Sequence, residues 1–273
     1  ALTPRNIHAK DFTWFTNLNF GFNDNTVLQE TVAENSTTPS REGYPIGAIF
    51  TYKTAGLDDE GYPLYLTKDG QKLSAKDFFQ LNNAGASSLS AEEQRNLLTY
   101  MGSTDPKVSG GFTNTFKYQR VTLSVNCIFN FGMHVQTTPS YSLTTYDRGL
   151  NTNRDILNRW TPDNPEGTSP RLINSSDRPE EYSFYDNYPI LNSLDIYVKK
   201  QNYFRFQSIR LAYDLPTHWL KPIGVKSASV SLEGRDLWVI ASNYHNYLDP
   251  ETMGNPYASP IPKSFIFGLN VNF

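Results

Sequence analysis

The sequence predicts an all-β protein of about seven antiparallel strands that form part of a transmembrane barrel wall. Three observations predict this. Apolar and polar residues alternate along the candidate strands, which is the period of a strand with two different faces. No run approaches the roughly 18 consecutive apolar residues that indicate a membrane-spanning helix. Short and long connections alternate along the chain, as they do in outer-membrane barrels.

The predicted strands share one design, an apolar face opposite a polar one. Along the chain, the apolar faces comprise Phe12, Trp14, Leu18, Phe20 and Phe22; Ile46, Ala48, Phe50 and Tyr52; Phe112, Phe116 and Tyr118; Val121, Leu123, Val125, Cys127, Phe129 and Phe131; Ala228, Val230 and Leu232; and Phe265, Phe267, Leu269, Val271 and Phe273. In 203–213 the apolar phase changes after Phe206, which predicts a β-bulge near Gln207 and Ser208. The interrupted stretch 26–52 counts as one ascending strand.

The connections set the predicted orientation. Short links are expected at 23–25, 117–120 and 214–225, and external loops at about 55–108, 134–202 and 238–262. If Phe273 lies on the periplasmic side, the strand in 11–22 descends and the chain begins outside. Short helices are expected within the loops at 74–85, 89–102 and 153–160, the second with Ser90 and Glu93 as a capping box.

Composition argues against several functional classes. The net charge is −3 and no basic cluster is present, so we expect no nucleic-acid partner. The single cysteine, Cys127, precludes an intrachain disulfide and is interpreted as a packing residue. The four histidines have no metal-ligand spacing, so we expect neither a metal nor a cofactor. No nucleophile elbow, zinc-protease motif or phosphate loop occurs, and we expect no enzymatic activity.

Seven stretches in a fixed order resemble one family. They are KDFTWFTNLNFGFNDNTVL, YPIGAIFTYKTAGLDDEGYPLY, NRWTPDNP, NYFRFQSIRLAYDLP, VSLEGRDLWVI, YLDPE and PKSFIFGLNVNF. Together they are similar to the C-terminal portion of SusC-like TonB-dependent outer-membrane transporters of Bacteroidota, the SusC/RagA family. The resemblance covers essentially all 273 residues. It implies about a third of a 22-stranded, plugged barrel in the outer membrane of a Gram-negative bacterium.

The resemblance also implies a function and its partners. Family members import oligosaccharides or peptides, so the expected partners are the rest of the barrel and its plug, a SusD-like surface lipoprotein, TonB, outer-membrane lipids and the cargo. The plug and the TonB box precede this portion in the family, and we expect both to be absent from 1–273. The chain opens at Ala1 without a signal peptide, which fits a processed start or a piece of a longer protein.

Three sets of residues are candidates for function. Phe273 resembles the terminal aromatic that is read by the barrel-insertion machinery. Arg210, Asp214, Glu233 and Arg235 are expected on the face toward the lumen, either along a solute path or paired as wall charges. The ligand-binding candidates are loop residues, mostly aromatic, because flat rings stack on sugars and hydroxyls add hydrogen bonds: Trp160, Tyr182, Tyr185, Tyr188, Tyr244, His245, Tyr247 and Asp249. Packing within the loops or contact with the lipoprotein is the competing interpretation for each.

Two other functional hypotheses remain open at this point. A secreted or surface β-sandwich could show the same alternation and bind glycans through its loop aromatics. A sandwich buries its apolar faces, whereas a barrel wall presents them to lipid. A non-importing outer-membrane scaffold barrel would use the same wall, and only a plug and a TonB box elsewhere would separate it from an importer.

Overall fold

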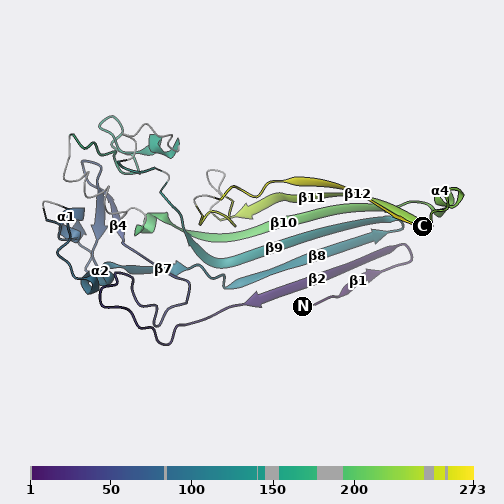
Figure 1. The fold of residues 1–273 in the computed structure, drawn as a ribbon, viewed down its shortest axis with the longest axis horizontal. Helices are drawn as coiled ribbons and strands as arrows, with labels where there is room; N and C mark the ends of the chain where they lie inside the picture. Colours follow the sequence, from purple (N-terminus) through teal and green to yellow (C-terminus); the bar gives the residue numbers. More distant parts are fainter. Residues whose placement is uncertain are drawn as a thin grey trace.

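The computed structural model describes residues 2–82, 85–139, 141–144, 154–176, 193–242, 249–255 and 258–273. A seven-stranded antiparallel sheet dominates it, with the strand order β1-β2-β8-β9-β10-β11-β12 (Figure 1). The strands are β1 (Arg5–His8), β2 (Phe12–Phe22), β8 (Val108–Tyr118), β9 (Val121–Gln136), β10 (Val198–Asp214), β11 (Ser227–Ala241) and β12 (Ser264–Asn272). Each of these strands pairs with its neighbour in chain order, which confirms the predicted wall of consecutive antiparallel strands.

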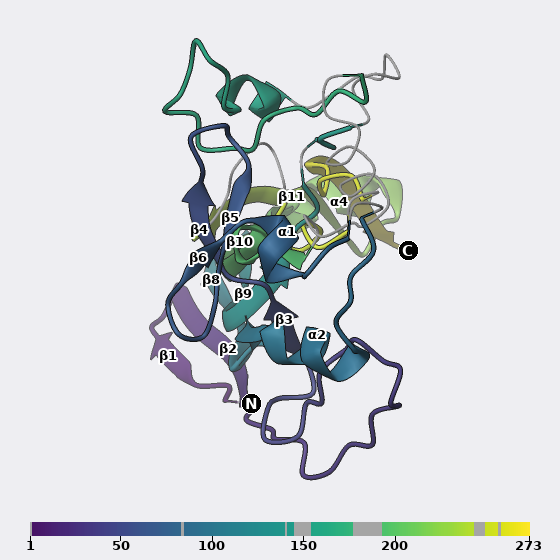
Figure 2. The same cartoon turned by 90° about the vertical axis from the view of Figure 1, so that its left-hand side faces the viewer.

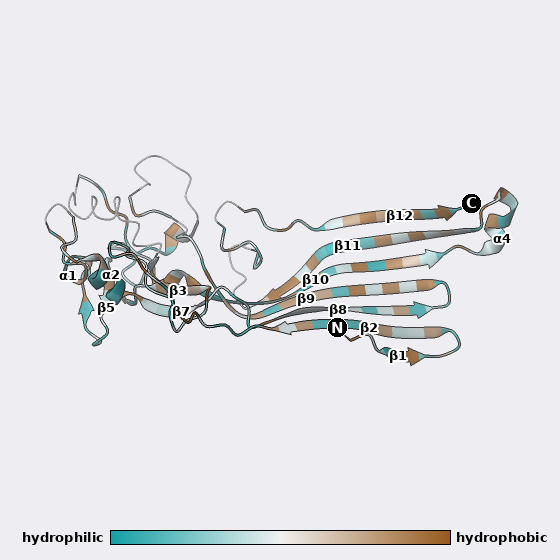
Figure 3. Cartoon of the chain, turned by 60° about the horizontal axis from the view of Figure 1, so that its bottom comes forward, coloured by the Kyte–Doolittle hydropathy of each residue, from teal (hydrophilic) through white to brown (hydrophobic). Residues whose placement is uncertain are grey.

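The predicted alternation produces two distinct faces on this sheet. Residues that pair across neighbouring strands share a face, and Leu211, Leu232 and Phe267 form one such row on β10, β11 and β12. These apolar side chains are 51%, 54% and 73% exposed. We call this side the apolar face and the opposite side the polar face. The brown and teal bands along each strand in Figure 3 follow the same alternation.

The change of phase in β10 is a β-bulge, as predicted. Against β9, the register of β10 shifts between Phe206 and Ser208, and Gln207 is the extra residue. Against β11 the register shifts at the same place, where Gln207 faces two residues, Asp236 and Leu237. An extra residue moves the following side chains to the opposite face. The bulge therefore keeps Ile209 on the same apolar face as Phe206.

One predicted wall strand was wrong. Within 26–52 the strand is β3 (Ala48–Thr51), which pairs with β7 (Thr99–Ser103) outside the seven-stranded sheet. The seventh strand is instead β1, which pairs with β2 through a short turn. Consequently β2 runs in the direction opposite to the one expected, and the links between strands span 23–107, 137–197 and 242–263. The strand β3 belongs to a small two-stranded sheet with one face covered by other loop residues. Such a strand alternates in the same way as a wall strand, so the pattern in 46–52 did not distinguish the two.

Loop segments form a second structural unit at one end of the sheet, which we call the loop layer (Figure 2). It contains the β3–β7 pair, the three-stranded sheet of β4 (Thr54–Leu57), β5 (Pro63–Leu66) and β6 (Lys72–Leu73), and the helices α1 (Ala75–Phe78) and α2 (Ala91–Leu97). Described parts of 137–197 complete it, including the short helices η2 (Arg154–Asn158) and η4 (Asp195–Tyr197). The three predicted helices therefore form outside the wall. Within the described ranges no helix is both long and apolar enough to cross a membrane.

The loop layer has its own hydrophobic core. Seven buried residues from the two long segments 23–107 and 137–197 form it: Tyr65, Phe78, Phe79, Tyr141, Leu143, Ile173 and Leu194. Backbone hydrogen bonds from Tyr52 N to Ser193 O and from Asp195 N to Tyr52 O join the first long segment to the second, at 2.8 and 3.0 Å. Two loops that are distant in sequence therefore fold as one packed unit.

Candidate functional site

Two features at the loop-layer end of the sheet combine buried charge, aromatic rings and open space. The first is a groove along the β3–β7 pair. The second is an ionic cluster around Arg205 that holds residues 249–255 against the polar face. The groove offers surface to a ligand, whereas the cluster fixes the loop that follows β11.

The groove consists of two adjoining cavities of about 500 and 480 Å³. Lys53, Thr99 and Tyr100 line both of them, so the cavities meet at β7. The first cavity extends to Gly132 and His134, near the C-terminal end of β9. The second extends to Lys68 and Gly70. Volumes of this size are typical of small-molecule sites.

Three aromatic rings form one wall of the groove. Tyr44, Phe50 and Tyr100 lie with their ring centroids 4.9 to 5.9 Å apart, in tilted and edge-on arrangements. Phe50 and Tyr100 are opposite each other in the β3–β7 ladder, and Tyr44 comes from the segment before β3. Tyr44 keeps 38% of its surface exposed. A ring held at this exposure can stack on a flat partner and still offer its hydroxyl.

The charged groups of the groove are of both signs. Lys53 and Lys107 line the first cavity together with Asp24 and Asp105. Burial, and then the proximity of the Tyr44 phenol, raises the pKa of Tyr100. Tyr100 therefore remains a neutral phenol at physiological pH, able to donate and accept hydrogen bonds. The groove suits a neutral or zwitterionic polar ligand with apolar faces.

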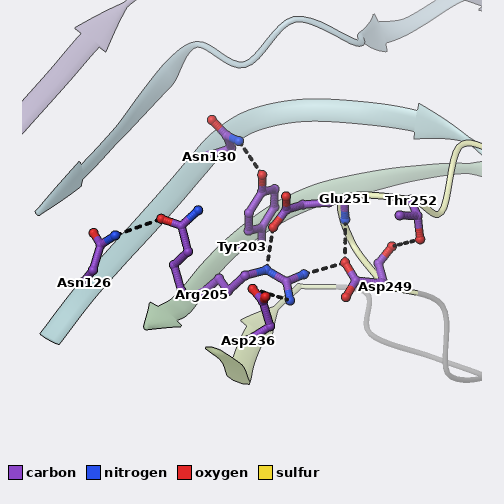
Figure 4. A network of polar contacts seen from close by, with 9 residues as sticks. Asn126, Asn130, Tyr203, Arg205, Asp236, Asp249, Glu251 and Thr252 are labelled. Atoms are coloured by element: carbon purple, nitrogen blue, oxygen red, sulfur yellow. Dashed lines mark hydrogen bonds and ion pairs between the residues drawn. The ribbon is translucent and has the colours of Figure 1, made fainter. Parts of the chain in front are cut away.

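The ionic cluster is built on a single buried cation. Arg205 on β10 is 2% exposed, and its guanidinium donates to Asp249 Oδ1 and Glu251 Oε1, both at 2.5 Å (Figure 4). Asp236 Oδ1 lies 3.9 Å from Arg205 Nη1. Asp249 Oδ1 also accepts the backbone N–H of Glu251 at 2.9 Å. A buried charge is tolerated only when it is paired and hydrogen-bonded, and here one cation meets three carboxylates.

The alternation of residues along β10 places Arg205 on the polar face. Gln201, Tyr203 and Arg205 are alternate residues on the polar face and are 4%, 5% and 2% exposed. The Tyr203 hydroxyl accepts from Asn130 Nδ2 on β9 at 2.5 Å. Beside them, Met253 is 6% exposed and Gly254 lies so close to Val135 that a Cβ would contact it. Residues 249–255 therefore cover this part of the polar face.

The residues expected to face the lumen all lie on the polar face. Arg210 is directly opposite Glu233, and Asp214 is opposite Ser229, in the β10–β11 ladder. Glu233 Oε1 accepts from Arg235 Nε at 2.6 Å. Arg210 Nη2 donates to Ser231 Oγ at 3.3 Å. Glu233 and Arg235 thus form a wall ion pair, and a solute path remains a proposal.

Two of the ligand-binding candidates have intramolecular partners. Trp160 has the Arg171 guanidinium over its ring, 5.3 Å from the centroid, and Gly61 is packed so close that a Cβ would meet the indole. Asp249 is 3% exposed and pairs with Arg205. These contacts fit the packing interpretation of both residues. Tyr182, Tyr185, Tyr188, Tyr244, His245 and Tyr247 lie outside the described residues.

Sequence reasoning missed Arg205, Asp236 and Glu251. The signal was present: an arginine between Phe204 and Phe206 points away from the apolar face, and acids occur in the RDLW and LDPE stretches that carry the family resemblance. Only the fold shows that these three stretches meet. Within the described part of the chain, no group of three or more His, Cys, Asp or Glu residues is placed to hold a metal ion.

Comparisons with known proteins agree with this architecture. TonB-dependent receptors P3 and P26 of Formosa agariphila are 23% and 24% identical to the chain, over 100% of its length. The solved structure of the RagAB peptide transporter superposes with a TM-score of 0.71 at 22% identity, over 99% of the chain. The RagAB peptide importer in the closed-closed state gives the same TM-score at 21% identity. No family model matches the chain.

These likenesses to TonB-dependent receptors support the interpretation of the chain as a segment of a SusC-like TonB-dependent transporter. It spans 28% of the length of the curated relatives and 28% of the RagAB chain that it matches. The seven-stranded sheet therefore has the fold of the corresponding part of the RagAB chain. Phe273 follows β12 and is 78% exposed, on the strand at one edge of that sheet.

Proposed function

We propose that the chain supplies wall strands and loops to an outer-membrane TonB-dependent importer of oligosaccharides or peptides in a Gram-negative bacterium. The protein acts as a transporter component and not as an enzyme. TonB drives uptake through the part of the protein that precedes this chain, and a SusD-like lipoprotein covers the loop layer. The names of the curated relatives and of the RagAB structures support this assignment.

The exposed apolar face is the observation that carries the proposal. Large apolar side chains on several neighbouring strands are more than half exposed, among them Phe20, Phe22, Leu211, Leu232, Trp238, Ile240, Phe265, Phe267 and Leu269. A water-soluble protein rarely exposes a contiguous apolar patch of this kind. Lipid is the solvent that makes such a surface favourable, because burial of apolar area in hydrocarbon removes it from water.

Aromatic residues occur along the whole length of the apolar face. Phe22 and Phe131 lie in the row nearest the loop layer. Leu123 lies in the same row as Phe116 and Trp14, whose rings stack with centroids 5.6 Å apart. A face of this kind is favourable in lipid, because hydrocarbon removes its apolar area from water.

The sandwich alternative does not fit this arrangement. A sandwich needs a second sheet packed about 10 Å from the apolar face. In the described part of the chain, the two other sheets belong to the loop layer at the end of the main sheet (Figure 1). The scaffold-barrel alternative shares the wall and is separated from the importer by experiment.

We place cargo contacts in the loop layer. The groove beside Tyr44, Phe50 and Tyr100 is the described candidate, and its mixed charges match the amides and termini of peptides or the hydroxyls of sugars. Among the loop candidates predicted from the sequence, Tyr182, Tyr185, Tyr188, Tyr244, His245 and Tyr247 stay as proposed contacts. Trp160 and Asp249 would act by holding the loops in place.

The first test is the composition of the native particle. The protein is extracted from membranes in detergent without prior dissociation, and its mass and subunits are determined by mass spectrometry and peptide mapping. We expect this sequence within a chain that also carries a plug, together with a lipoprotein. A particle that lacks a plug would overturn the importer assignment and favour the scaffold barrel, and a monodisperse protein that needs no detergent would overturn both.

The groove is tested by affinity for cargo. Tyr100→Ala in the intact transporter removes one ring, and Tyr118→Ala removes an exposed ring at the opposite end of the sheet. An aromatic contact is worth about 0.5–1.5 kcal/mol, so we expect affinity for peptide or oligosaccharide mixtures to fall roughly two- to twelvefold with Tyr100→Ala only. Equal affinity in the two variants would remove the groove as the contact site.

A further inference from the structure

The connection between β10 and β11 differs from the other turns at its end of the sheet. The turns at 9–11 and 119–120 are tight, whereas 215–226 contain the helix α4 (Thr217–Leu220) followed by η5 (Lys221–Ile223). Figure 1 shows this connection projecting beyond the strands, close to the C-terminus and far from the loop layer. A plain turn would suffice to join two antiparallel strands, so the extra helical residues require an explanation.

The connection folds onto the apolar side of the sheet. Leu220 and Val225 are 5% and 7% exposed and pack with Ala228, which is 9% exposed. Ala228 is opposite Val271 and is separated from Val230 by one residue, so it belongs to the apolar face. Leu215, the next residue after Asp214, completes the cluster. The helical residues are therefore anchored at the edge of the lipid-facing surface and not over the polar face.

Large apolar side chains on the same helical stretch remain exposed. Trp219 is 60% exposed and Ile223 is 69% exposed. They are four residues apart along consecutive helical turns, a spacing that places side chains on one face. Phe273 is 78% exposed, and its neighbour Asn272 is opposite Ser227, directly after this connection. A small apolar surface therefore continues the apolar face past the ends of its strands.

Basic residues surround this surface. Lys221 and Lys226 flank Ile223, and His218 packs edge-on against Trp219 with centroids 5.8 Å apart. The two tight turns at the same end add the cations Lys10, Lys117 and Arg120, against the acids Asp11 and Asp214. This pattern of Trp and Ile beside lysines matches a membrane interface, where rings lie at headgroup level and cations meet lipid phosphates.

We propose that residues 216–226 form an interfacial anchor that inserts Trp219 and Ile223 at the boundary between phospholipid headgroups and acyl chains. Lys221 and Lys226 contact the lipid phosphates. The inference rests on the proposed placement of the sheet in the outer membrane. The anchor fixes the height of β10 and β11 in the bilayer, and these strands carry Arg205 and Asp236 at their other ends.

The test measures the depth of single spin labels in the intact transporter, reconstituted in phospholipid vesicles that include an anionic lipid. Trp219→Cys and Ile223→Cys report on the anchor, Phe267→Cys on the centre of the apolar face, and Lys226→Cys on its polar flank. Collision with oxygen and with a water-soluble nickel chelate is recorded at each site. We expect labels at 219 and 223 to meet oxygen more than chelate, at a depth between those at 267 and 226.

Three results would overturn the anchor. A label at 219 as accessible to the chelate as the one at 226 places the helix in water. A label at 219 protected from both quenchers places it against protein. In both cases, a label at 267 that still reports lipid leaves the proposed barrel wall intact. A label at 267 in contact with the chelate instead contradicts the outer-membrane assignment itself.

A charge-neutral variant checks the role of the lysines. Lys221→Gln combined with Lys226→Gln removes two cations from the connection without altering the buried Leu220 or Val225. We expect the label at 219 to become shallower in vesicles that contain anionic lipid and to change little in purely zwitterionic vesicles. An equal depth for both proteins in both kinds of vesicle would remove the phosphate contacts from the proposal.

Discussion

The seven-stranded sheet and the loop layer use similar aromatic residues and place them in opposite environments. On the sheet, Phe265 and Phe267 are 72% and 73% exposed. In the loop layer, Tyr65 and Phe78 are 0% and 4% exposed, and their rings are stacked 5.1 Å apart. The proposed placement of the sheet in the outer membrane explains this difference, because the two regions then contact different solvents. Rings on the sheet are stable in contact with lipid. The loop layer is surrounded by water, so its rings are stable only when they are buried.

The two regions also differ in how their contacts are distributed along the sequence. Alternation identifies each wall strand from its own residues, and the wall strands then pair in the order in which they occur in the chain. The core of the loop layer joins Tyr65 to Leu143, Ile173 and Leu194, which come from two different long segments. The faces of the wall strands are therefore set by alternation within each strand, whereas the core of the loop layer depends on packing between distant segments.

The largest effect is expected from a substitution that disrupts the core of the loop layer and leaves the wall unchanged. Phe78→Ala removes a buried ring that packs on Tyr65 and Phe79, and such truncations cost about 3–5 kcal/mol. We expect amides of β5 to exchange much faster in the intact transporter while those of β9 keep their protection. Leu157→Ala, at a residue that is 64% exposed, is the matched control. Equal loss of protection in β5 and β9 would show that the two regions fold as one unit.

A comparable effect is expected at Arg205, where the sheet holds the loop that follows β11. Arg205→Met leaves Asp249 and Glu251 without their cation, and breaking a buried ion pair costs about 3–5 kcal/mol. We expect residues 249–255 to become cleavable by protease in folded transporter, whereas Arg210→Met, at an exposed wall position, has little effect. Adding Asp249→Leu to Arg205→Met should restore part of the protection, because it removes an unpaired buried carboxylate. Resistance in Arg205→Met alone would exclude the ionic cluster as the tether.

Most of the wall was predictable from the sequence, for a physical reason. The membrane requires every backbone group to be paired and one face of each strand to be apolar, so the pattern survives in residues such as Leu123, Val125 and Phe129. The bulge at Gln207 was found by the same pattern. The error at 26–52 has a related origin. The strand β3 also alternates, but it buries Ile49 and Thr51, on the face opposite to Ala48 and Phe50, and short alternation does not reveal which face a partner covers.

The candidate site was predictable only in part. Alternation placed Arg210 and Glu233 on the polar face because the pairing of β10 with β11 is regular from Ser208 to Asp214. It could not reveal that Arg205 is buried, because the covering residues 249–255 come from a loop whose path depends on the whole fold. The groove has the same character: Tyr44 and Tyr100 meet across 55 intervening residues, and no periodicity links them.

A smaller effect is expected from a charge on the apolar face. Leu232→Arg places a guanidinium on the central part of β11, where a cation at the bilayer midplane costs about 2–4 kcal/mol. We expect a lower urea midpoint for the transporter folded in vesicles. Ser229→Arg, on the polar face of the same strand, is the control and should be tolerated. A similar loss in both variants would mean that the two faces see the same solvent.

Loss of a helix cap should produce a local effect in the loop layer. The Ser90 hydroxyl accepts the backbone N–H of Glu93, and the Glu93 carboxylate accepts the backbone N–H of Ser90 at 2.7 Å. Ser90→Ala removes one arm of this capping box, at a cost of about 0.5–2 kcal/mol. Faster exchange of the α2 amides is the expected readout, with Glu92→Gln, which leaves the box intact, as control. Unchanged exchange in Ser90→Ala would show that tertiary contacts alone hold the helix.

The smallest effect is the pH dependence of the same cap. Hydrogen bonds from the Ser90 side chain and then its backbone N–H lower the pKa of Glu93 below its usual value. A carboxyl whose pKa is lowered in the folded state stabilises that state above its unfolded pKa, and this contribution is lost as pH falls through the lowered value. We therefore expect α2 to fray in acid while the wall, whose strands rely on paired backbone and lipid contact, keeps its protection. Glu93→Gln should remove the pH dependence of α2 exchange that remains after correction for intrinsic rates, and a variant that still frays with the same midpoint would assign the transition to another group.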